Sequence, residues 1–313
     1  MFSTRVLGEE SDFLAFESAQ SAELTSLTYD RVAEAYDDLW SPHVVRPNAR
    51  LTKALRIGPG DRVADLACGT GVYTLDMAAA AAPGEVVAVD FSEGMLAGAR
   101  ARAEAEGLDL TLVHARAEEF IVASTPASFD VVSLRFVLAY IDWNEVLPRT
   151  ERLLRHGGRV GVLTSVTTSV PQFYQLFDRF RGSFEPVWKL YKHNRRDIPE
   201  TWKMFRRLRE TFADGRFIAV PDSAETVARR LAAGGLVPTD TWTETIRLWF
   251  DSGDAAVYWI RNSGYATHPA LDHVGPQAVR FLEDLFAAGM ETFREEQGVP
   301  LDLVIGGVVA EKR

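Results

Sequence analysis

The sequence contains a single cysteine, Cys68, among its 313 residues. One cysteine can form neither an internal disulfide nor a cysteine metal cluster, so we predict no metal site and a reducing, cytoplasmic environment. Long apolar runs are also missing, because no stretch approaches the ~20 residues that span a bilayer. The first residues show no apolar signal core. We therefore expect neither export nor membrane insertion.

Basic residues are in deficit. Lys and Arg number 34 against 44 Asp and Glu, which gives a formal charge of -10. Broad nucleic-acid binding depends on neutralising phosphates with Lys and Arg, so this balance argues against it. The hydrophobic share of 47% is ordinary for a globular protein with a real core. We expect a small molecule as partner, and a homodimer is compatible with the composition.

Strand and helix patterns alternate from about residue 27 to residue 166. Near-continuous apolar segments separated by helices are typical of a parallel sheet covered on both faces, that is, of an α/β protein. We expect seven strands, at 63–66, 85–90, 110–113, 129–134, 159–164, 241–250 and 301–310. We expect helices at 72–82, 92–106, 144–155 and 224–233.

Outside this alternation the chain is helical and aromatic. The prediction is an N-terminal helical cap over residues 1–45 and a core over residues 46–313. Two helical lid insertions interrupt the core, at about 167–217 and 251–298. In the cap, Tyr29 and Tyr36 share one face of an amphipathic helix. The first insertion is rich in Lys, Arg and aromatic residues, which predicts either ordinary amphipathic helices or a lid that attracts an anionic acceptor.

A glycine turn follows the first strand, in the segment VADLACGTG. Gly69 and Gly71 let the backbone approach a ligand closely, and Asp90 ends the next strand, where a carboxylate can accept both hydroxyls of a ribose. A dinucleotide site would have a third glycine, but Thr74 stands there. Asp65 before the turn would oppose a pyrophosphate and suit an ammonium group. The pattern favours a ligand with a ribose and a cationic end over a simple structural turn.

These residues resemble the class I methyltransferases that depend on S-adenosylmethionine (SAM), especially the branch of ubiquinone and menaquinone biosynthesis. The resemblance covers about residues 29–163. It implies a Rossmann-like, doubly wound, mostly parallel seven-stranded sheet with SAM as cofactor. The segments that carry it occur in the expected order: TYDRVAEAYDDLW, VADLACGTG, VVAVDFSEGML, FDVVSLRFVLAYI and LLRHGGRVGVL.

The resemblance also implies which residues hold the methionine end of SAM. Asp65 and the backbone of Ala67 and Gly69 would bind it, on the turn that Gly71 completes. The backbone at Leu134 and Arg135 would contact its amino group. Tyr29 and Tyr36 would close over the carboxylate and the sulfonium.

The adenosine end falls to other residues in the same resemblance. Asp90 would bind the ribose diol, and Phe91 and Met95 would cover the adenine. Ala117 and Glu118 would meet the adenine edge.

Methyl transfer from SAM needs placement of the acceptor more than it needs a catalytic group, and the sequence contains no catalytic motif. We expect a small, largely apolar or aromatic, and possibly anionic metabolite of secondary metabolism. Oxygen, nitrogen and carbon all remain open as the methylated atom, with oxygen or carbon slightly favoured. The candidates for the acceptor pocket are Tyr36, His43, Tyr140, Tyr174 and His268. One alternative is a SAM-fold protein without methyl transfer, a cyclase or a ligand-binding partner. A weaker one is an NAD-dependent oxidoreductase.

Overall fold

The computed structural model describes residues 29–30, 36–172, 175–176, 179, 220–263 and 276–313. Its centre is one seven-stranded sheet in the order β3-β2-β1-β4-β5-β7-β6. The first five strands run parallel, and β7 is antiparallel to both of its neighbours. The strands are β1 (Arg62–Leu66), β2 (Glu85–Asp90), β3 (Thr111–His114), β4 (Phe129–Arg135), β5 (Leu154–Ser165), β6 (Leu236–Phe250) and β7 (Val299–Lys312). The mostly parallel seven-stranded sheet is confirmed.

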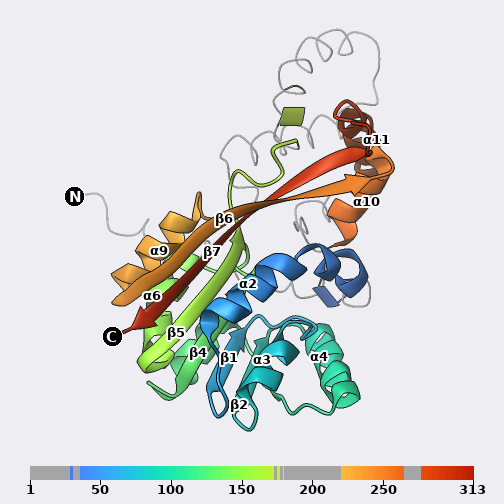
Figure 1. Cartoon of the computed structure of the whole chain (residues 1–313). Coiled ribbons are helices and arrows are strands. Elements are labelled where there is room, and N and C mark those ends of the chain that lie inside the picture. The colour runs from blue at the N-terminus through green and yellow to red at the C-terminus, as the bar shows by residue number, and fades with distance from the viewer. Residues whose placement is uncertain (1–28, 31–35, 173–174, 177–178, 180–219, 264–275) are drawn as a thin grey trace, which may run out of the picture.

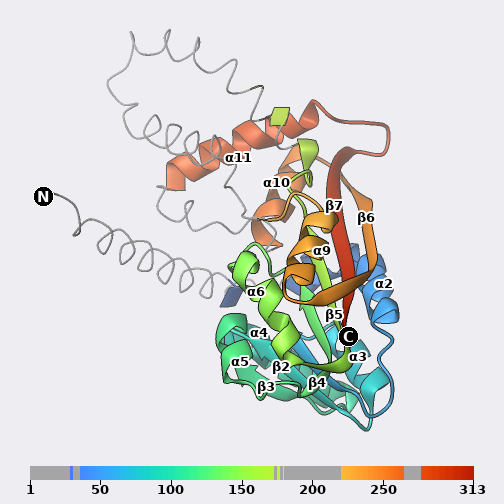
Figure 2. The same ribbon diagram turned by 90° about the vertical axis from the view of Figure 1, so that its left-hand side faces the viewer.

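Helices cover both faces of this sheet (Figures 1 and 2). One face packs on α2 and α3 and the other on α5, α6 and α9, each through its own cluster of buried apolar side chains. The helices of the sheet layers are α2 (Val45–Leu55), α3 (Thr74–Ala81), α4 (Glu93–Glu106), α5 (Ala117–Ala123), α6 (Trp143–Arg149) and α9 (Ala224–Ala233). Short 3-10 turns lie at η1 (Ser41–His43) and η2 (Thr150–Leu153).

Helix ends follow local sequence rules. Ser92 caps α4 by accepting a hydrogen bond from the Met95 N–H, and Gly107 ends the same helix with φ +65°. Ser223 caps α9 in the same way. The predicted helices at 92–106 and 224–233 are therefore confirmed, because their start and stop signals are local.

Two further helices, α10 (Gly253–Asn262) and α11 (Pro276–Glu291), lie beyond the sheet layers. The long strands β6 and β7 extend past the others toward them (Figure 1). The described part of the insertion at 251–298 is thus mainly helical, while its role as a lid stays a prediction. Within the residues that the structure describes, no helix combines the length and apolarity that a membrane span requires.

Several predicted boundaries were wrong. The strands expected at 159–164 and 241–250 begin five residues earlier, at Leu154 and Leu236. The helix expected at 144–155 ends at Arg149, turns through η2, and gives way to β5 at Leu154. Pro148 inside α6 lacks the N–H that would continue the helix, and Leu154 pairs with Phe129 of β4. The sequence also left α2 unassigned; it begins at the predicted boundary between cap and core and packs on β5 and β7.

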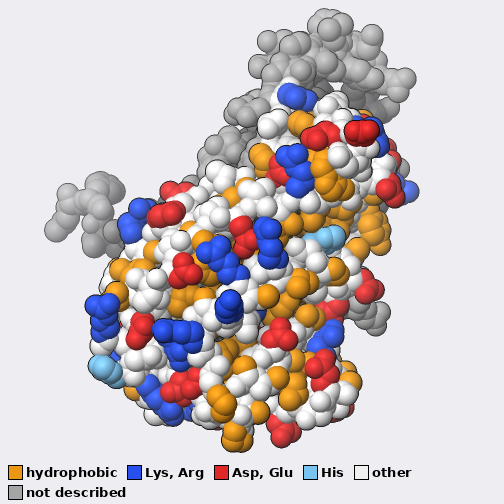
Figure 3. Space-filling model, viewed as in Figure 1, with side chains coloured by type: hydrophobic (Ala, Val, Ile, Leu, Met, Phe, Trp, Pro, Cys, Tyr) orange, Lys and Arg blue, Asp and Glu red, His pale blue; other side chains and the backbone are white. Residues whose placement is uncertain are grey.

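Basic and acidic side chains are interspersed over the face that carries α2 (Figure 3). The acidic excess of the chain therefore forms no single patch among the described residues of that face. An interspersed surface of this kind gives no strong field for steering a charged polymer.

Candidate functional site

The turn after β1 is held in an unusual backbone conformation. Ala67, Gly69 and Gly71 have φ of +63°, +57° and +80°. A side chain on Gly71 would approach the Cβ of Ala99 on α4 to 3.1 Å, whereas the space beside Gly69 is open. The backbone is therefore tight against the protein at Gly71 and accessible to a ligand at Gly69.

Asp90 lies at the carboxyl end of β2, facing this turn. One of its carboxylate oxygens accepts from the Gly69 N–H at 2.8 Å and the other from the Ser92 N–H at 3.0 Å. Burial raises the pKa of Asp90 to about 6, although these N–H groups favour the ionised form. Asp90 is thus ionised at neutral pH and is already oriented by the glycine turn.

A cavity opens beside Asp90, where the strand order reverses between β1 and β4. Its empty volume is about 390 Å³, including the part that is open to solvent. Ligands of open α/β sheets bind at this switch point, outside the carboxyl ends of the strands. We call this the Asp90 cavity, and it is lined by Ala67, Asp90, Phe91, Ala115, Arg116, Ala117, Glu118, Val137, Tyr140 and Ile141.

Glu118 contributes an unsatisfied acceptor to the wall of the Asp90 cavity. Its Oε1 accepts from Arg116 at 3.4 Å, but its buried Oε2 has no hydrogen-bond partner in the structure. A buried acceptor without a donor is costly, so a ligand that supplies an N–H group there would be favoured.

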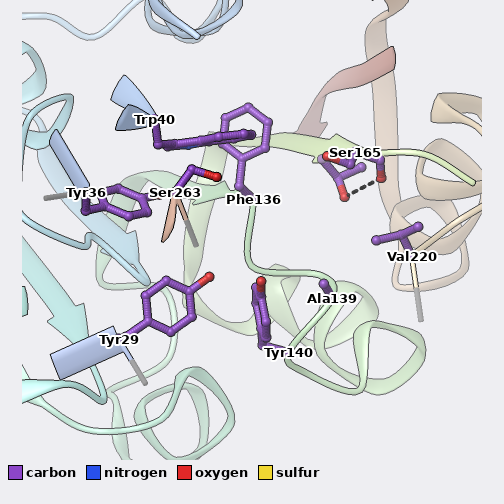
Figure 4. A pocket seen from close by; sticks show the side chains of 10 residues that line it. Tyr29, Tyr36, Trp40, Phe136, Ala139, Tyr140, Ser165, Val220 and Ser263 are labelled. Carbon is purple, nitrogen blue, oxygen red and sulfur yellow. Dashed lines mark hydrogen bonds between the residues drawn. The ribbon is translucent and has the colours of Figure 1, made fainter. Parts of the chain in front are cut away.

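A second cavity, of about 400 Å³, lies on the other side of Tyr140. The Tyr29 and Tyr140 rings meet edge to face at 5.4 Å, and Trp40 meets Phe136 in the same way at 5.2 Å. Figure 4 shows the hydroxyls of Tyr29 and Tyr140 directed into the same space, below the Trp40 and Phe136 rings. We call it the tyrosine cavity, lined by Tyr29, Tyr36, Trp40, Phe136, Ala139, Tyr140, Thr164, Ser165, Val220 and Ser263.

The tyrosine cavity is aromatic and neutral. Burial raises the pKa of Tyr36 well above its ordinary value, with Tyr140 and Asp90 acting in the same direction. Its phenol therefore stays protonated and can donate a hydrogen bond. Among the described lining residues there is no Asp, Glu, His, Lys or Cys. The described wall thus offers hydroxyl groups and rings but no side chain that takes up a proton readily near neutral pH.

Asp65 and Thr74, the two residues that decided between cofactors in the sequence, bind each other. The Thr74 hydroxyl donates to Asp65 Oδ2 at 2.6 Å, and Asp65 is only 3% exposed. The buried guanidinium of Arg135 acts on this carboxylate as a positive charge that lowers its pKa. Asp65 lines neither cavity, so the expectation of a free negative charge facing a cationic ligand has to be revised: the protein balances that charge itself.

The other predicted site residues divide into three groups. Met95 and Leu134 are buried, at 2% and 0% exposure, and line neither cavity. His43 packs edge-on against Trp259, with ring centroids 5.7 Å apart, and is not among the lining residues. Tyr174 and His268 lie outside the described residues.

The basic first insertion also lies largely outside the described residues. The one basic member that is described, Arg179, donates to the Thr292 hydroxyl and stacks on Phe293. The attraction of an anionic acceptor by this segment therefore stays a prediction.

Several residues of the tyrosine cavity were not predicted from the sequence. Trp40 and Phe136 line the tyrosine cavity, and Ser263 reaches it from the end of α10. Phe136 has φ +55°, which costs about 1–2 kcal/mol for a residue with a side chain. Backbone strain of this kind is concentrated at functional sites, but it is invisible in a sequence pattern.

Comparison with known proteins finds a methyltransferase domain and methyltransferase relatives. A family model described as a methyltransferase domain matches residues 63–158. A demethylmenaquinone methyltransferase of Listeria welshimeri is 27% identical over 203 residues, which is 60% of this chain and 85% of that protein. One from Bacillus cytotoxicus is 31% identical over 156 residues, covering 48% and 65% of the two chains. The YcgJ protein of Bacillus subtilis matches in structure with a TM-score of 0.52 at 18% identity, over 85% of this chain and 97% of that one.

Proposed function

Since the chain is a class I SAM-dependent methyltransferase, we propose that it transfers the methyl group to a small aromatic or apolar acceptor bound in the tyrosine cavity. The observation that carries this proposal is the arrangement of the two cavities on either side of Tyr140. A cofactor in one and an acceptor in the other would meet at this residue.

The Asp90 cavity suits the adenosine part of SAM. The Asp90 carboxylate can accept from ribose hydroxyls, because each of its oxygens keeps a lone pair beyond its bond to a backbone N–H. Phe91 provides a ring beside the same cavity. The open space at Gly69 leaves room for the methionine part. When bound, SAM supplies the activated methyl group, and the chain's own residues place the acceptor and exclude water.

Glu118 would read the adenine base. Its unpaired Oε2 can accept a hydrogen bond from the exocyclic amino group of adenine but not from the carbonyl of hypoxanthine. We expect S-adenosylhomocysteine (SAH) to bind roughly tenfold more tightly than its inosine analogue, the value of one charge-assisted hydrogen bond. Glu118→Gln, whose amide can also donate, is expected to narrow this preference in a competition assay. An unchanged preference would remove Glu118 from the base contact.

The tyrosine cavity favours oxygen or carbon as the methylated atom. Protonated phenols such as that of Tyr36 stabilise an acceptor that carries negative charge, such as a phenolate or its ring carbon. An amine becomes cationic as it is methylated, and the described lining holds no carboxylate to balance that charge. The relatives named above are named for methyl transfer to demethylmenaquinone, a quinone. This supports a ring-bearing acceptor here.

A matched pair of acceptors tests this proposal. The purified chain is incubated with methyl-labelled SAM and either 1,4-dihydroxynaphthalene or 1-naphthylamine, which present similar rings with different nucleophiles. We expect SAH release and label transfer with the first and little with the second. Transfer confined to the amine would contradict the preference for oxygen or carbon. Tight SAM binding without transfer to any acceptor would support the alternative of a SAM-fold protein that has lost methyl transfer.

A further inference from the structure

Arg135 is a charged side chain buried between β4, α2 and α3. It is 8% exposed and lies at the end of β4. Its guanidinium donates to Ser133 Oγ at 2.9 Å, to Asn48 Oδ1 at 3.0 Å and to Thr52 Oγ1 at 3.0 Å. These acceptors are all neutral, so they satisfy its N–H groups without balancing its charge.

The balancing charge is Asp65 on the neighbouring strand. Asp65 pairs in register with Ser133, and Ser133 stands between the carboxylate and the guanidinium. Burial raises the pKa of Asp65, while Arg135 and the hydroxyls of Thr74 and Ser133 oppose that rise. Two buried opposite charges that interact across Ser133 depend on each other, since either one alone is an uncompensated charge in a medium of low polarity.

Asp65 in turn connects the two ends of the glycine turn. Asp65 lies before the turn and accepts a hydrogen bond from Thr74, the first residue of α3, nine positions further along the chain. The turn that carries Ala67, Gly69 and Gly71 lies between these two residues. A fixed distance between Asp65 and Thr74 therefore restricts the conformations that the turn can adopt.

We propose that Arg135 is a positioning residue for the cofactor: its charge balances that of Asp65, and the Asp65–Thr74 contact holds the glycine turn in the form that binds SAM. This inference rests on the proposed cofactor site. It assigns to the side chain of Arg135 a role that is separate from any backbone contact with the ligand.

Other titratable groups near the pair act on it less directly. Asp76 and Tyr73 of the α3 region face Arg135, whose guanidinium lies 5.9 Å from the Tyr73 ring centroid. Asp90 and Cys68 are close enough to Asp65 for its negative charge to raise their pKa values. Loss of Arg135 would leave Asp65 among groups that are negative or neutral, so Asp65 could relax only by taking up a proton.

Three variants test the proposal: Arg135→Met, Asp65→Asn and the double variant. Arg135→Met is expected to lower the Tm by roughly 6–15 °C at pH 8. The loss of Tm should be smaller at pH 6. Without Arg135 the pKa of Asp65 in the folded protein rises further, so at low pH the folded protein holds Asp65 protonated and uncharged. At pH 8 Asp65 must either stay ionised without a balancing charge or hold its proton at a free-energy cost, and the folded state is destabilised more. The Kd for SAH, relative to wild type at the same pH, should rise at least about tenfold at pH 8 and less at pH 6. The double variant should restore both the Tm and the affinity for SAH. Its remaining differences from the wild type in Tm and Kd should not depend on pH.

Thr52→Val is the matched control, because it removes a hydrogen bond from Arg135 but leaves its charge. It should lower the Tm without a pH-dependent change in the Kd ratio. If Arg135→Met does not fold, the double variant must still bind SAH more tightly than Asp65→Asn alone. Wild-type affinity in Arg135→Met at both pH values, or a pH-independent Tm loss with no rescue, would overturn the proposal. Failure of the wild type itself to bind SAH would instead refute the cofactor site.

Discussion

Asp90→Ala is expected to weaken SAH binding by roughly 10²–10⁴-fold, which corresponds to two charge-assisted hydrogen bonds of about 1.5–3 kcal/mol each. The carboxylate is oriented by the N–H groups of Gly69 and Ser92, so its replacement removes both the acceptor for the ribose and a link to the glycine turn. Isothermal titration calorimetry with SAH measures the loss. A far-UV circular dichroism spectrum like that of the wild type would show that the sheet persists.

Asp130→Ala is the matched control at the opposite end of the sheet. Asp130 also accepts a backbone hydrogen bond, from the Arg62 N–H at 2.8 Å, and pairs with Arg155. Its loss should lower stability and leave the SAH affinity unchanged. Equal losses of affinity in the two variants would mean that any broken strand contact disturbs the site, and would remove Asp90 from the ribose contact.

The pH dependence of binding gives a second readout of Asp90. Its pKa of about 6 in the free protein should fall when ribose hydroxyls donate to the ionised carboxylate, so binding releases a proton. The affinity of the wild type should therefore be constant near pH 7 and decrease below pH 6, by up to about tenfold per pH unit. Asp90→Ala should lose this dependence between pH 5 and pH 7. The same slope in both proteins would assign the titration to another group.

Tyr140→Ala is expected to lower kcat by about 10²-fold, because misplacement of an acceptor by even 1 Å has an effect of that size. Tyr140 is the residue that lines both the Asp90 cavity and the tyrosine cavity. Its removal would join the two spaces and admit water between the methyl group and the acceptor. The Kd for SAH should change much less than kcat, because Asp90 and the glycine turn remain.

Two further variants show whether the ring or the hydroxyl of Tyr140 matters. Tyr140→Phe keeps the edge-to-face contact with Tyr29 and should keep most of the activity if the residue acts as a wall. Tyr258→Ala on α10 removes a tyrosine that is 60% exposed and should leave kcat unchanged. A loss in Tyr140→Phe as large as in Tyr140→Ala would instead show that the hydroxyl acts on the acceptor.

The sequence alone determined the sheet, and it predicted where along the sheet the cofactor would bind. Strands such as β1 and β2 are near-continuous apolar runs, and caps such as Ser92 and Gly107 are local signals, so both can be recognised without tertiary contacts. The glycine turn and Asp90 follow strand ends, and parallel strands bring their carboxyl ends to one edge. The helix expected at 144–155 failed because the pairing of Leu154 with β4 is a long-range contact.

Only the tertiary structure showed which groups surround Asp65 and which residues line the tyrosine cavity. In the sequence, Asp65 is a negative charge next to a turn, but its partner Arg135 is seventy positions away and comes beside it only through the pairing of β1 with β4. The tyrosine cavity likewise combines residues that precede α2, the segment that follows β4, the end of β5 and the end of α10. A periodic pattern reports which face of an element is buried, but not which distant side chain balances a charge or closes a cavity.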